Sequence, residues 1–196
     1  MKFRAMIVLA ATAMLSACGI NSVPTAEENA KARWADVQAA YQRRADTIPN
    51  VVATVKGSAA SEGKILTDVI NARANATRVQ VNATDLTDPA KIASYQAAQT
   101  QLGASLGRLL ATVEAYPDLK SQENFRSLIT EIEGSNNRIT IAIRDYNTAV
   151  QAYNTRIRTF PDAVGAKIFY GAKPMVPFQA QAGAEANPTV DFGNTN

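Results

Sequence analysis

Residues 123–160, ENFRSLITEIEGSNNRITIAIRDYNTAVQAYNTRIRTF, carry the clearest structural pattern in the chain. Its apolar residues recur at steps of three and four, and Ser135 fills the one skipped turn. The series consists of Phe125, Leu128, Ile132, Ile139, Ala142, Tyr146, Val150, Tyr153, Ile157 and Phe160. These steps place side chains on one face of an α-helix, and a repeat of about 3.5 residues favours packing along the whole length. The stretch therefore predicts one long helix that ends at Pro161.

Three further apolar stripes with helical spacing precede this stretch. They consist of Ala30, Trp34, Val37, Tyr41 and Ile48, then Val52, Val55, Ala59, Leu66, Val69 and Ala76, and then Ile92, Tyr95, Leu102, Leu106, Leu109, Val113 and Tyr116. Four apolar-faced helices with short connections bury one another. The pattern therefore predicts an all-α, antiparallel up-and-down four-helix bundle.

Three local signals predict where these helices begin and end. Thr25 and Glu28 have the spacing of a capping box, so we expect the first helix to begin there. Asp88 followed by Pro89 is typical of an N-cap and the first helical residue. Pro49 removes a helical hydrogen bond, which predicts a kink or a break. If Pro49 only kinks the first helix, the alternative is a bundle of three long helices.

The first eighteen residues, MKFRAMIVLAATAMLSAC, have the pattern of an export signal. Two basic residues precede an apolar stretch that is too short to span a bilayer. The four residues that end at Cys18 resemble the lipobox of bacterial lipoproteins. This resemblance implies cleavage between Ala17 and Cys18 and a covalent diacylglycerol and N-acyl lipid on Cys18. An ordinary signal peptide with an incidental cysteine is the alternative.

The lipid on Cys18 predicts lasting attachment to a membrane. Lipoprotein sorting rules favour the periplasmic leaflet of the outer membrane, if the source has two membranes, because Gly19 rather than Asp follows the cysteine. The chain then divides into a signal peptide (1–17), a lipidated cysteine with its tether (18–24), a helical bundle (25–170) and a tail (171–196). Within the bundle, residues 164–170 form a short amphipathic piece that we expect to fold back. The tail carries three prolines and no stripe, so we expect it to be largely disordered, from about residue 180 onward. Whether it packs on the bundle after Gly171 stays open.

Composition argues against most familiar active sites. The chain has no histidine, which is the commonest general base and zinc ligand, and its single cysteine can form no internal disulfide. We therefore expect no enzyme activity, no metal and no cofactor beyond the covalent lipid. The formal net charge is +3, and part of it comes from Lys2 and Arg4 in the signal, so we expect no nucleic-acid partner.

A few polar residues lie where the stripes predict burial. Glu62 and Arg73 occupy positions on the second apolar stripe. One interpretation is a buried ionic site for a ligand. The interpretation that we favour is pairing with Gln99 or Asn136 on neighbouring helices, which would set the register of the bundle.

A Tyr-Asn pair occurs twice in the last stripe, at Tyr146-Asn147 and Tyr153-Asn154, one heptad apart. Tyrosine in the stripe with asparagine beside it predicts packing between helices with side-chain hydrogen bonds. A ladder that binds a ligand is the alternative. Asn147 and Asn154 thus join the predicted buried polar network.

Three ordered groups of residues resemble the signatures of LemA family proteins over roughly residues 27 to 180. They are Tyr41-Gln42-Arg43-Arg44, Ile48-Pro49-Asn50-Val51-Val52 and Val55-Lys56-Gly57; Ala115-Tyr116-Pro117-Asp118-Leu119-Lys120 with Phe125 and Leu128; and Glu133-Gly134, Asn137-Arg138-Ile139, Tyr146-Asn147, Val150, Tyr153-Asn154 and Phe160-Pro161. The resemblance implies a membrane-anchored, up-and-down four-helix bundle with no established reaction. The chain departs from the family pattern at Ser135 and Asn136, where an acidic residue is usual, and in its lipobox, where many relatives have an uncleaved membrane helix.

These observations predict a non-catalytic lipoprotein of the cell envelope that acts as a scaffold or accessory protein through protein–protein contact. We expect the membrane, through the lipid, and an envelope protein as its partners, and leave open a homo-oligomer. The alternative is a carrier that binds an apolar or lipidic ligand in the bundle core.

Overall fold

The computed structural model describes residues 21–56, 63–114 and 116–179, and these residues form helices and no strand. The long helices are α2 (Ser22–Lys56), α3 (Gly63–Arg78), α4 (Pro89–Val113) and α6 (Glu123–Arg156). The shorter elements are η1 (Ala83–Asp85), α5 (Pro117–Lys120), α7 (Asp162–Gly165) and the π-helical η2 (Ala166–Tyr170). The all-α prediction is confirmed for this part of the chain.

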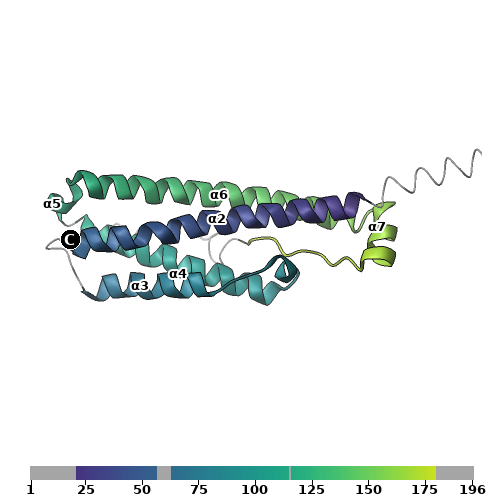
Figure 1. Cartoon of the computed structure of the whole chain (residues 1–196), viewed down its shortest axis with the longest axis horizontal. Helices are drawn as coiled ribbons and strands as arrows, with labels where there is room; N and C mark the ends of the chain where they lie inside the picture. The colour runs from purple at the N-terminus through teal and green to yellow at the C-terminus, as the bar shows by residue number, and fades with distance from the viewer. Residues whose placement is uncertain (1–20, 57–62, 115, 180–196) are drawn as a thin grey trace, which may run out of the picture.

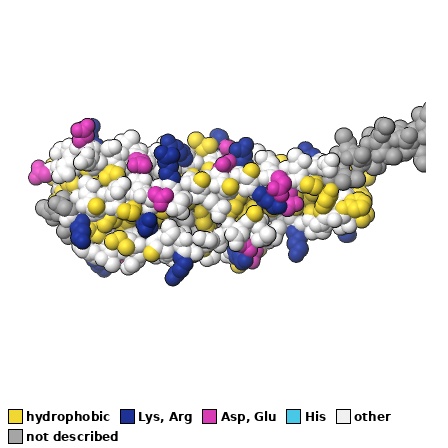
Figure 2. All heavy atoms as spheres, viewed as in Figure 1, with side chains coloured by type: hydrophobic (Ala, Val, Ile, Leu, Met, Phe, Trp, Pro, Cys, Tyr) yellow, Lys and Arg dark blue, Asp and Glu magenta, His cyan; other side chains and the backbone are white. Residues whose placement is uncertain are grey.

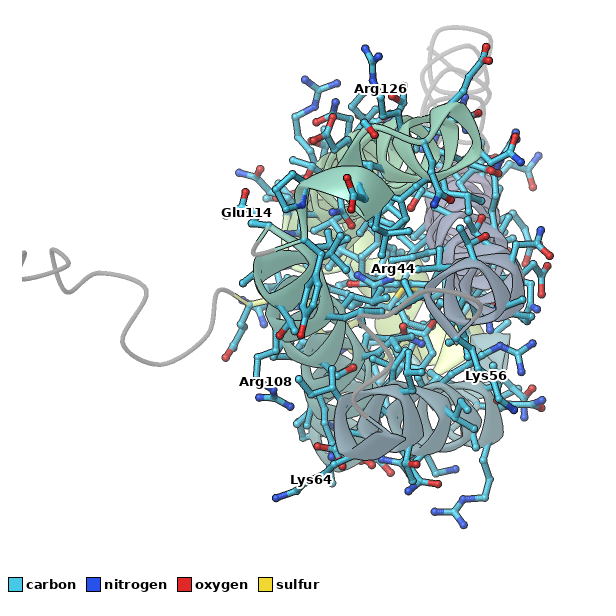
Figure 3. The ribbon with its side chains drawn as sticks, turned by 90° about the vertical axis from the view of Figure 1, so that its left-hand side faces the viewer. Arg44, Lys56, Lys64, Arg108, Glu114 and Arg126 are labelled. Carbon is cyan, nitrogen blue, oxygen red and sulfur yellow. The ribbon has the colours of Figure 1, made fainter. Side chains whose placement is uncertain are left out.

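The long helices lie side by side, and each runs opposite to the one before it (Figure 1). The most extensive contacts join α2 to α6 and α3 to α4, and α2 also contacts α3. Viewed from one end, Arg126 marks α6, Glu114 and Arg108 mark α4, Lys64 marks α3 and Lys56 marks α2 (Figure 3). In this order α4 and α6 are neighbours, although the two helices make few direct contacts, and a seam runs between them.

The first helix begins earlier than the capping pattern predicted. α2 starts at Ser22, and the hydroxyl of Thr25 donates to the carbonyl oxygen of Asn21 at 2.7 Å instead of capping the helix. Pro24 fits in the first turn because its missing N–H would have no helical partner there. Val23 is fully buried, so the added turn also extends the core. Residues 22–24, which we expected to be tether, are therefore helical.

The same helix continues through Pro49 to Lys56, so the break considered at Pro49 does not occur. Pro49 is exposed, whereas Val51 and Val55 in the next turns are fully buried. Burying each of these side chains contributes on the order of 1.5–3 kcal/mol, which offsets the roughly 3 kcal/mol that an interior proline costs. Val52 and Val55 thus extend the first helix and do not begin the second. Ala59 lies outside the described residues.

The start of α4 is confirmed. The carboxylate of Asp88 accepts hydrogen bonds from the backbone N–H groups of Ala90 at 2.9 Å and Lys91 at 3.3 Å, and Pro89 is the first helical residue. The side chain thereby satisfies donors that the first turn leaves without a helical partner.

The buried core has two parts. The aromatic cluster lies toward the beginning of α2 and the end of α6, and includes Trp34, Tyr41, Tyr95, Tyr146, Tyr153 and Phe178. The aliphatic cluster lies toward the opposite end, and includes Ile48, Val51, Val55, Leu66, Val69, Leu102, Leu106, Leu109, Phe125 and Ile132.

The end of the last stripe differs from the prediction. α6 ends at Arg156, and Phe160, which we expected on the buried face, is 86% exposed. In α7 and η2, Ala166 is buried, whereas Ile168 and Phe169 face solvent. The amphipathic piece at 164–170 therefore reaches the bundle through its smallest apolar side chain.

Residues 171–179, here named the tail segment, are extended and packed on the helices, so the first part of the predicted tail docks on the bundle, a question that the sequence left open. Gly171 has φ of 54°, a left-handed conformation that glycine adopts at little cost, and it turns the chain back after η2. Met175 and Phe178 are buried in the aromatic cluster. Residues 180–196 of the predicted tail, and the signal and lipidation site at 1–20, lie outside the described residues.

Candidate functional site

Two asparagines of α6 bind the backbone of the tail segment. Asn154 donates to the carbonyl oxygen of Met175 at 2.8 Å and accepts from its N–H at 2.9 Å. Asn147 donates to the carbonyl oxygen of Phe178 at 2.9 Å and accepts from its N–H at 2.8 Å. Each amide side chain thus completes both hydrogen bonds of one extended residue, as a neighbouring β-strand would.

The spacing of the two asparagines matches the spacing of an extended chain. Seven residues of α-helix rise about 10.5 Å. Three residues of extended chain span about 10 Å. Residues one heptad apart on α6 can therefore contact every third residue of an extended segment. The segment runs antiparallel to α6, since the later tail residue meets the earlier asparagine.

The two tyrosines beside them bind the same segment. The hydroxyl of Tyr146 donates to the carbonyl oxygen of Val176 at 2.9 Å, and that of Tyr153 donates to the carbonyl oxygen of Lys173 at 3.1 Å. Burial raises the pKa of both phenols above the usual value, so each hydroxyl keeps the proton that it donates. We name Tyr146, Asn147, Tyr153 and Asn154 the tail clamp.

The far side of the tail segment contacts α4 and the chain that leads into it. The N–H of Val176 donates to the carbonyl oxygen of Leu86 at 2.8 Å, and the side chain of Gln96 donates to the carbonyl oxygen of Gln179 at 3.2 Å. The tail segment therefore fills the seam between α4 and α6 over one half of the molecule.

Trp34 of α2 forms the centre of the packing beneath the tail segment. Its ring centroid lies 5.3 Å from that of Tyr95, 5.2 Å from that of Tyr146 and 6.0 Å from that of Phe178. Its indole N–H donates to the carbonyl oxygen of Val81 at 3.0 Å. One side chain thus connects α2, α4, α6, the chain before α4 and the tail segment.

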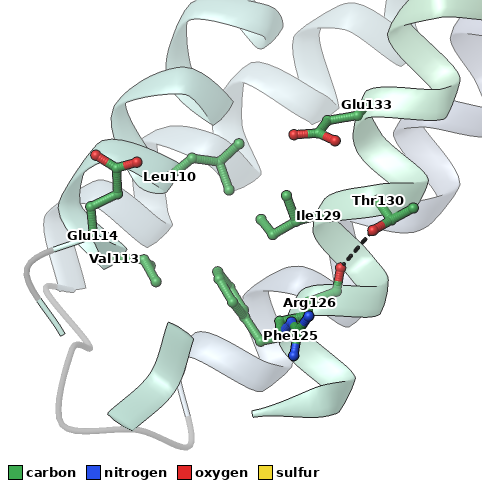
Figure 4. Close-up of a pocket in the computed structure, with 8 residues that line it drawn as sticks. All are labelled: Leu110, Val113, Glu114, Phe125, Arg126, Ile129, Thr130 and Glu133. Carbon is green, nitrogen blue, oxygen red and sulfur yellow. Dashed lines mark hydrogen bonds between the residues drawn. The ribbon is translucent and has the colours of Figure 1, made fainter. Parts of the chain in front are cut away.

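Over the other half of the molecule the same seam is open. A groove of about 320 Å³ lies between the end of α4 and the beginning of α6 (Figure 4). Its apolar lining comes from Leu110, Val113, Phe125 and Ile129, and Glu114, Arg126, Thr130 and Glu133 stand around it. We name it the seam groove.

A buried cation lies near the boundary between the two core clusters. Arg44 is 6% exposed, and its guanidinium donates to the backbone and side-chain oxygens of Gln99 at 2.9 Å and 3.2 Å. The guanidinium carbon also lies 5.1 Å from the centre of the Tyr41 ring, a cation–π distance. Burial lowers the pKa of Arg44, since it disfavours the charged form.

The structure separates the residues of the predicted polar network. Gln99 is buried, but its partners are Arg44 and the carbonyl oxygen of Ala76 rather than Arg73. Arg73 donates to the carbonyl oxygen of Ala45 at 2.7 Å. Asn136 is exposed, because its position falls beside the buried stripe and not on it, so its assignment to the network is wrong. Glu62, Ala17 and Cys18 lie outside the described residues.

Two parts of the site were missed. Arg44 sits three residues after Tyr41 on the first stripe, which was a sufficient signal that its side chain would be buried. The Tyr-Asn pairs do make side-chain hydrogen bonds, but with an extended segment rather than with a helix. A sequence signal for this extended partner was available. Met175 and Phe178 are large apolar residues three positions apart, and each directly follows a proline.

Nothing in the described part of the chain resembles a metal site, since no three acidic, cysteine or histidine residues gather there. None of its helices combines the length and hydropathy that crossing a bilayer requires.

Comparisons with known proteins find one family profile and several relatives. The sequence profile of the LemA family matches residues 33–192. Protein LemA of Metamycoplasma hominis is 28% identical over 124 residues, which cover 63% of this chain and 52% of that protein. Magnetosome proteins MamQ 2 and MamQ 1 of Paramagnetospirillum magneticum are each 37% identical over 59 residues, or 30% of this chain and 22% of theirs. The chain thus spans between about a fifth and about half of the length of these relatives.

Proposed function

The chain belongs to the LemA family, and we propose that it is a lipid-anchored envelope protein that acts by protein–protein contact and not by catalysis. In this proposal Cys18 carries the lipid in the periplasmic leaflet of an outer membrane. The helices form an antiparallel four-helix bundle that holds a binding surface away from the bilayer.

The observation that carries the proposal is the seam between α4 and α6. Over one half it is filled by an extended segment, whose backbone the tail clamp binds. Over the other half it is open as the seam groove (Figure 4). The same two helices, α4 and α6, flank both parts. A seam that binds an extended chain at one end is suited to bind another at its open end.

The chemistry of the groove indicates what it binds. Leu110, Phe125 and Ile129 form an apolar floor. The rim has two carboxylates, of Glu114 and Glu133, and one guanidinium, of Arg126. We therefore propose an extended segment of an envelope protein with large apolar side chains beside a lysine or arginine. The chain's own tail segment, with Lys173 before Met175 and Phe178, has this composition.

The described core does not favour the alternative of a ligand carrier. Trp34, Tyr146, Ile92 and Leu102 are each at most 1% exposed and fill the interior in both halves. A lipidic ligand would have to displace packed side chains, which costs about 2–5 kcal/mol for each large one lost.

In-cell photocrosslinking from the groove tests the proposal. A photoreactive residue at Thr130 lines the groove, and one at Thr140 is the control. Both threonines are exposed on α6 and donate to the carbonyl oxygen four residues earlier. We expect one envelope protein to crosslink from position 130 and not from 140, and a peptide from its crosslinked segment to bind the purified protein.

A groove variant completes the test. Ile129→Glu places a charge in the apolar floor and should abolish binding of that peptide, whereas Ile141→Glu, on an exposed part of α6, should leave it unchanged. A crosslink from position 130 to the chain's own residues 180–196, or a peptide that binds both variants equally, would contradict the proposal.

A further inference from the structure

Exposed apolar side chains gather at one end of the molecule. The large hydrophobic residues that remain most exposed there are Phe160 at 86%, Val164 at 49%, Ile168 at 69% and Phe169 at 66%. We name these four residues the end patch. Figure 2 shows apolar side chains gathered at this end. Elsewhere in the described residues, Ile70 and Ile141 are exposed to 50%, on different helices. A cluster of this kind on a small protein marks a surface that contacts something apolar.

The end patch lies where the chain enters the fold. α7 contacts α2, and the beginning of α2 lies at the same end of the molecule (Figure 1). Three residues, Gly19 to Asn21, separate Cys18 from Ser22. A fully extended chain spans at most about 3.6 Å per residue, so a lipid on Cys18 would hold the start of α2 within about 15 Å of the bilayer. This end of the molecule would then face the membrane.

The charges around the end patch suit a lipid surface. Arg158, Lys167 and Lys173, which lie within a few residues of the end patch in the sequence, are exposed. The nearby carboxylate of Asp162 is paired with Arg156 at 3.4 Å. Aromatic and aliphatic side chains flanked by basic residues are typical of surfaces that enter the headgroup region of a bilayer with anionic lipids.

We infer that the end patch is a membrane-contacting surface that inserts into the headgroup region beside the lipid anchor. This inference rests on the proposed attachment at Cys18. Two separate contacts with the bilayer, the lipid and the patch, would set the orientation of the helices, whereas a single point of attachment would not. The helical distance from Arg156 to Ile129 is about 40 Å, so the seam groove stands well away from the membrane.

The first experiment uses the lipidated full chain in vesicles of phosphatidylethanolamine and phosphatidylglycerol. Acylated Cys18 has no free thiol, so Phe169→Cys and Ile141→Cys each provide one site for an environment-sensitive fluorophore. We expect a nitroxide lipid in the bilayer to quench the probe at position 169 severalfold more strongly than the probe at 141. Equal quenching would overturn the inference.

The second experiment separates the patch from the anchor. The chain from Gly19 onward keeps every described residue and carries no lipid, so its sedimentation with the same vesicles measures the patch alone. Phe160→Ser/Ile168→Ser/Phe169→Ser should lower the bound fraction severalfold, and Ile70→Ser/Ile141→Ser should not. No binding by the unsubstituted chain, equal binding by both variants, or a dimer that the patch variant abolishes would overturn the inference. Mass spectrometry of the protein isolated from cells tests the anchor separately. If the proposed attachment is wrong, Cys18 will carry no lipid.

Discussion

The two halves of the molecule close the same seam in different ways. Around the aromatic cluster, the tail segment fills the space between α4 and α6, and the tail clamp binds its backbone. Around the aliphatic cluster, the two helices leave the seam groove open. Both halves depend on helices that are far apart in sequence, because α2 and α6 contribute to both clusters, and only the closed half adds a segment from beyond α6. The comparison indicates that the tail segment adds buried contacts to the closed half, whereas the open half keeps a groove exposed.

The largest loss of stability is expected from a substitution at the centre of the closed half. Trp34→Ala removes the ring that contacts Tyr95, Tyr146 and Phe178, and should lower the free energy of unfolding by about 3–5 kcal/mol. Urea unfolding followed by circular dichroism measures it. Trp34→Phe is the control and should cost clearly less. A cost below about 1 kcal/mol for Trp34→Ala would show that the tail segment does not depend on this packing.

Substitutions of Arg44 test how the buried charge near the boundary between the two halves contributes to stability. Arg44→Ala removes a buried side chain that binds Gln99 and should destabilise the fold by about 2–3 kcal/mol. Arg44→Met keeps most of the volume and removes the buried charge, so it should cost less than about 1.5 kcal/mol. The same urea experiment distinguishes them. If both variants were equally unstable, the charge and not the packing would be essential.

The tail clamp can be weakened without touching the core. Asn147→Ala leaves the N–H and carbonyl of Phe178 without partners and should destabilise the protein by about 1–3 kcal/mol. Hydrogen exchange should rise at Phe178 and leave the aliphatic half unchanged. Asn136→Ala, an exposed position on the same helix, should change stability by less than about 0.5 kcal/mol. Similar effects of the two variants would refute the clamp.

The smallest expected effect is a dependence of the free energy of unfolding on pH, and it arises in the closed half. Tyr41, Tyr95, Tyr146 and Tyr153 all lie in the aromatic cluster, and burial raises the pKa of each. Because the folded pKa lies above the unfolded value of about 10, the stabilisation is complete below pH 10 and is lost as the pH rises above it. Each such tyrosine lowers the free energy of unfolding by up to about 1.4 kcal/mol per pH unit.

Tyr146→Phe sharpens this prediction, since it removes one of the titrating groups. Between about pH 10 and 11 the stability of the variant should fall less steeply than that of the wild type. Urea midpoints across this range measure the two slopes. Parallel slopes would mean that Tyr146 ionises in the folded protein as it does in the unfolded chain.

The sequence predicted the long helices well because helical periodicity and capping are local. The stripe that begins at Phe125 and the cap at Asp88 depend on residues within a few turns, so both were found. The start at Thr25 and the break at Pro49 were wrong for one reason. In each case buried valines beyond the local signal, Val23 in one and Val51 in the other, extended α2. Capping residues and proline set only a local preference for where a helix begins or ends. Burial of apolar side chains in the tertiary structure can outweigh that preference.

The all-α fold, the apolar faces of the helices, the available polar residues and the family could all be predicted from the amino-acid sequence. The partners of those polar residues depend on how the helices pack together. The tail segment reaches the clamp across 20 to 31 residues, and Arg44 reaches Gln99 across 55. Such contacts form because packing the helices brings these groups into one place, where a buried polar group must find a partner or lose about 1–3 kcal/mol. The heptad spacing of the Tyr-Asn pairs predicted their hydrogen bonds, but the partner in the tail segment and the seam groove depend on how the helices pack.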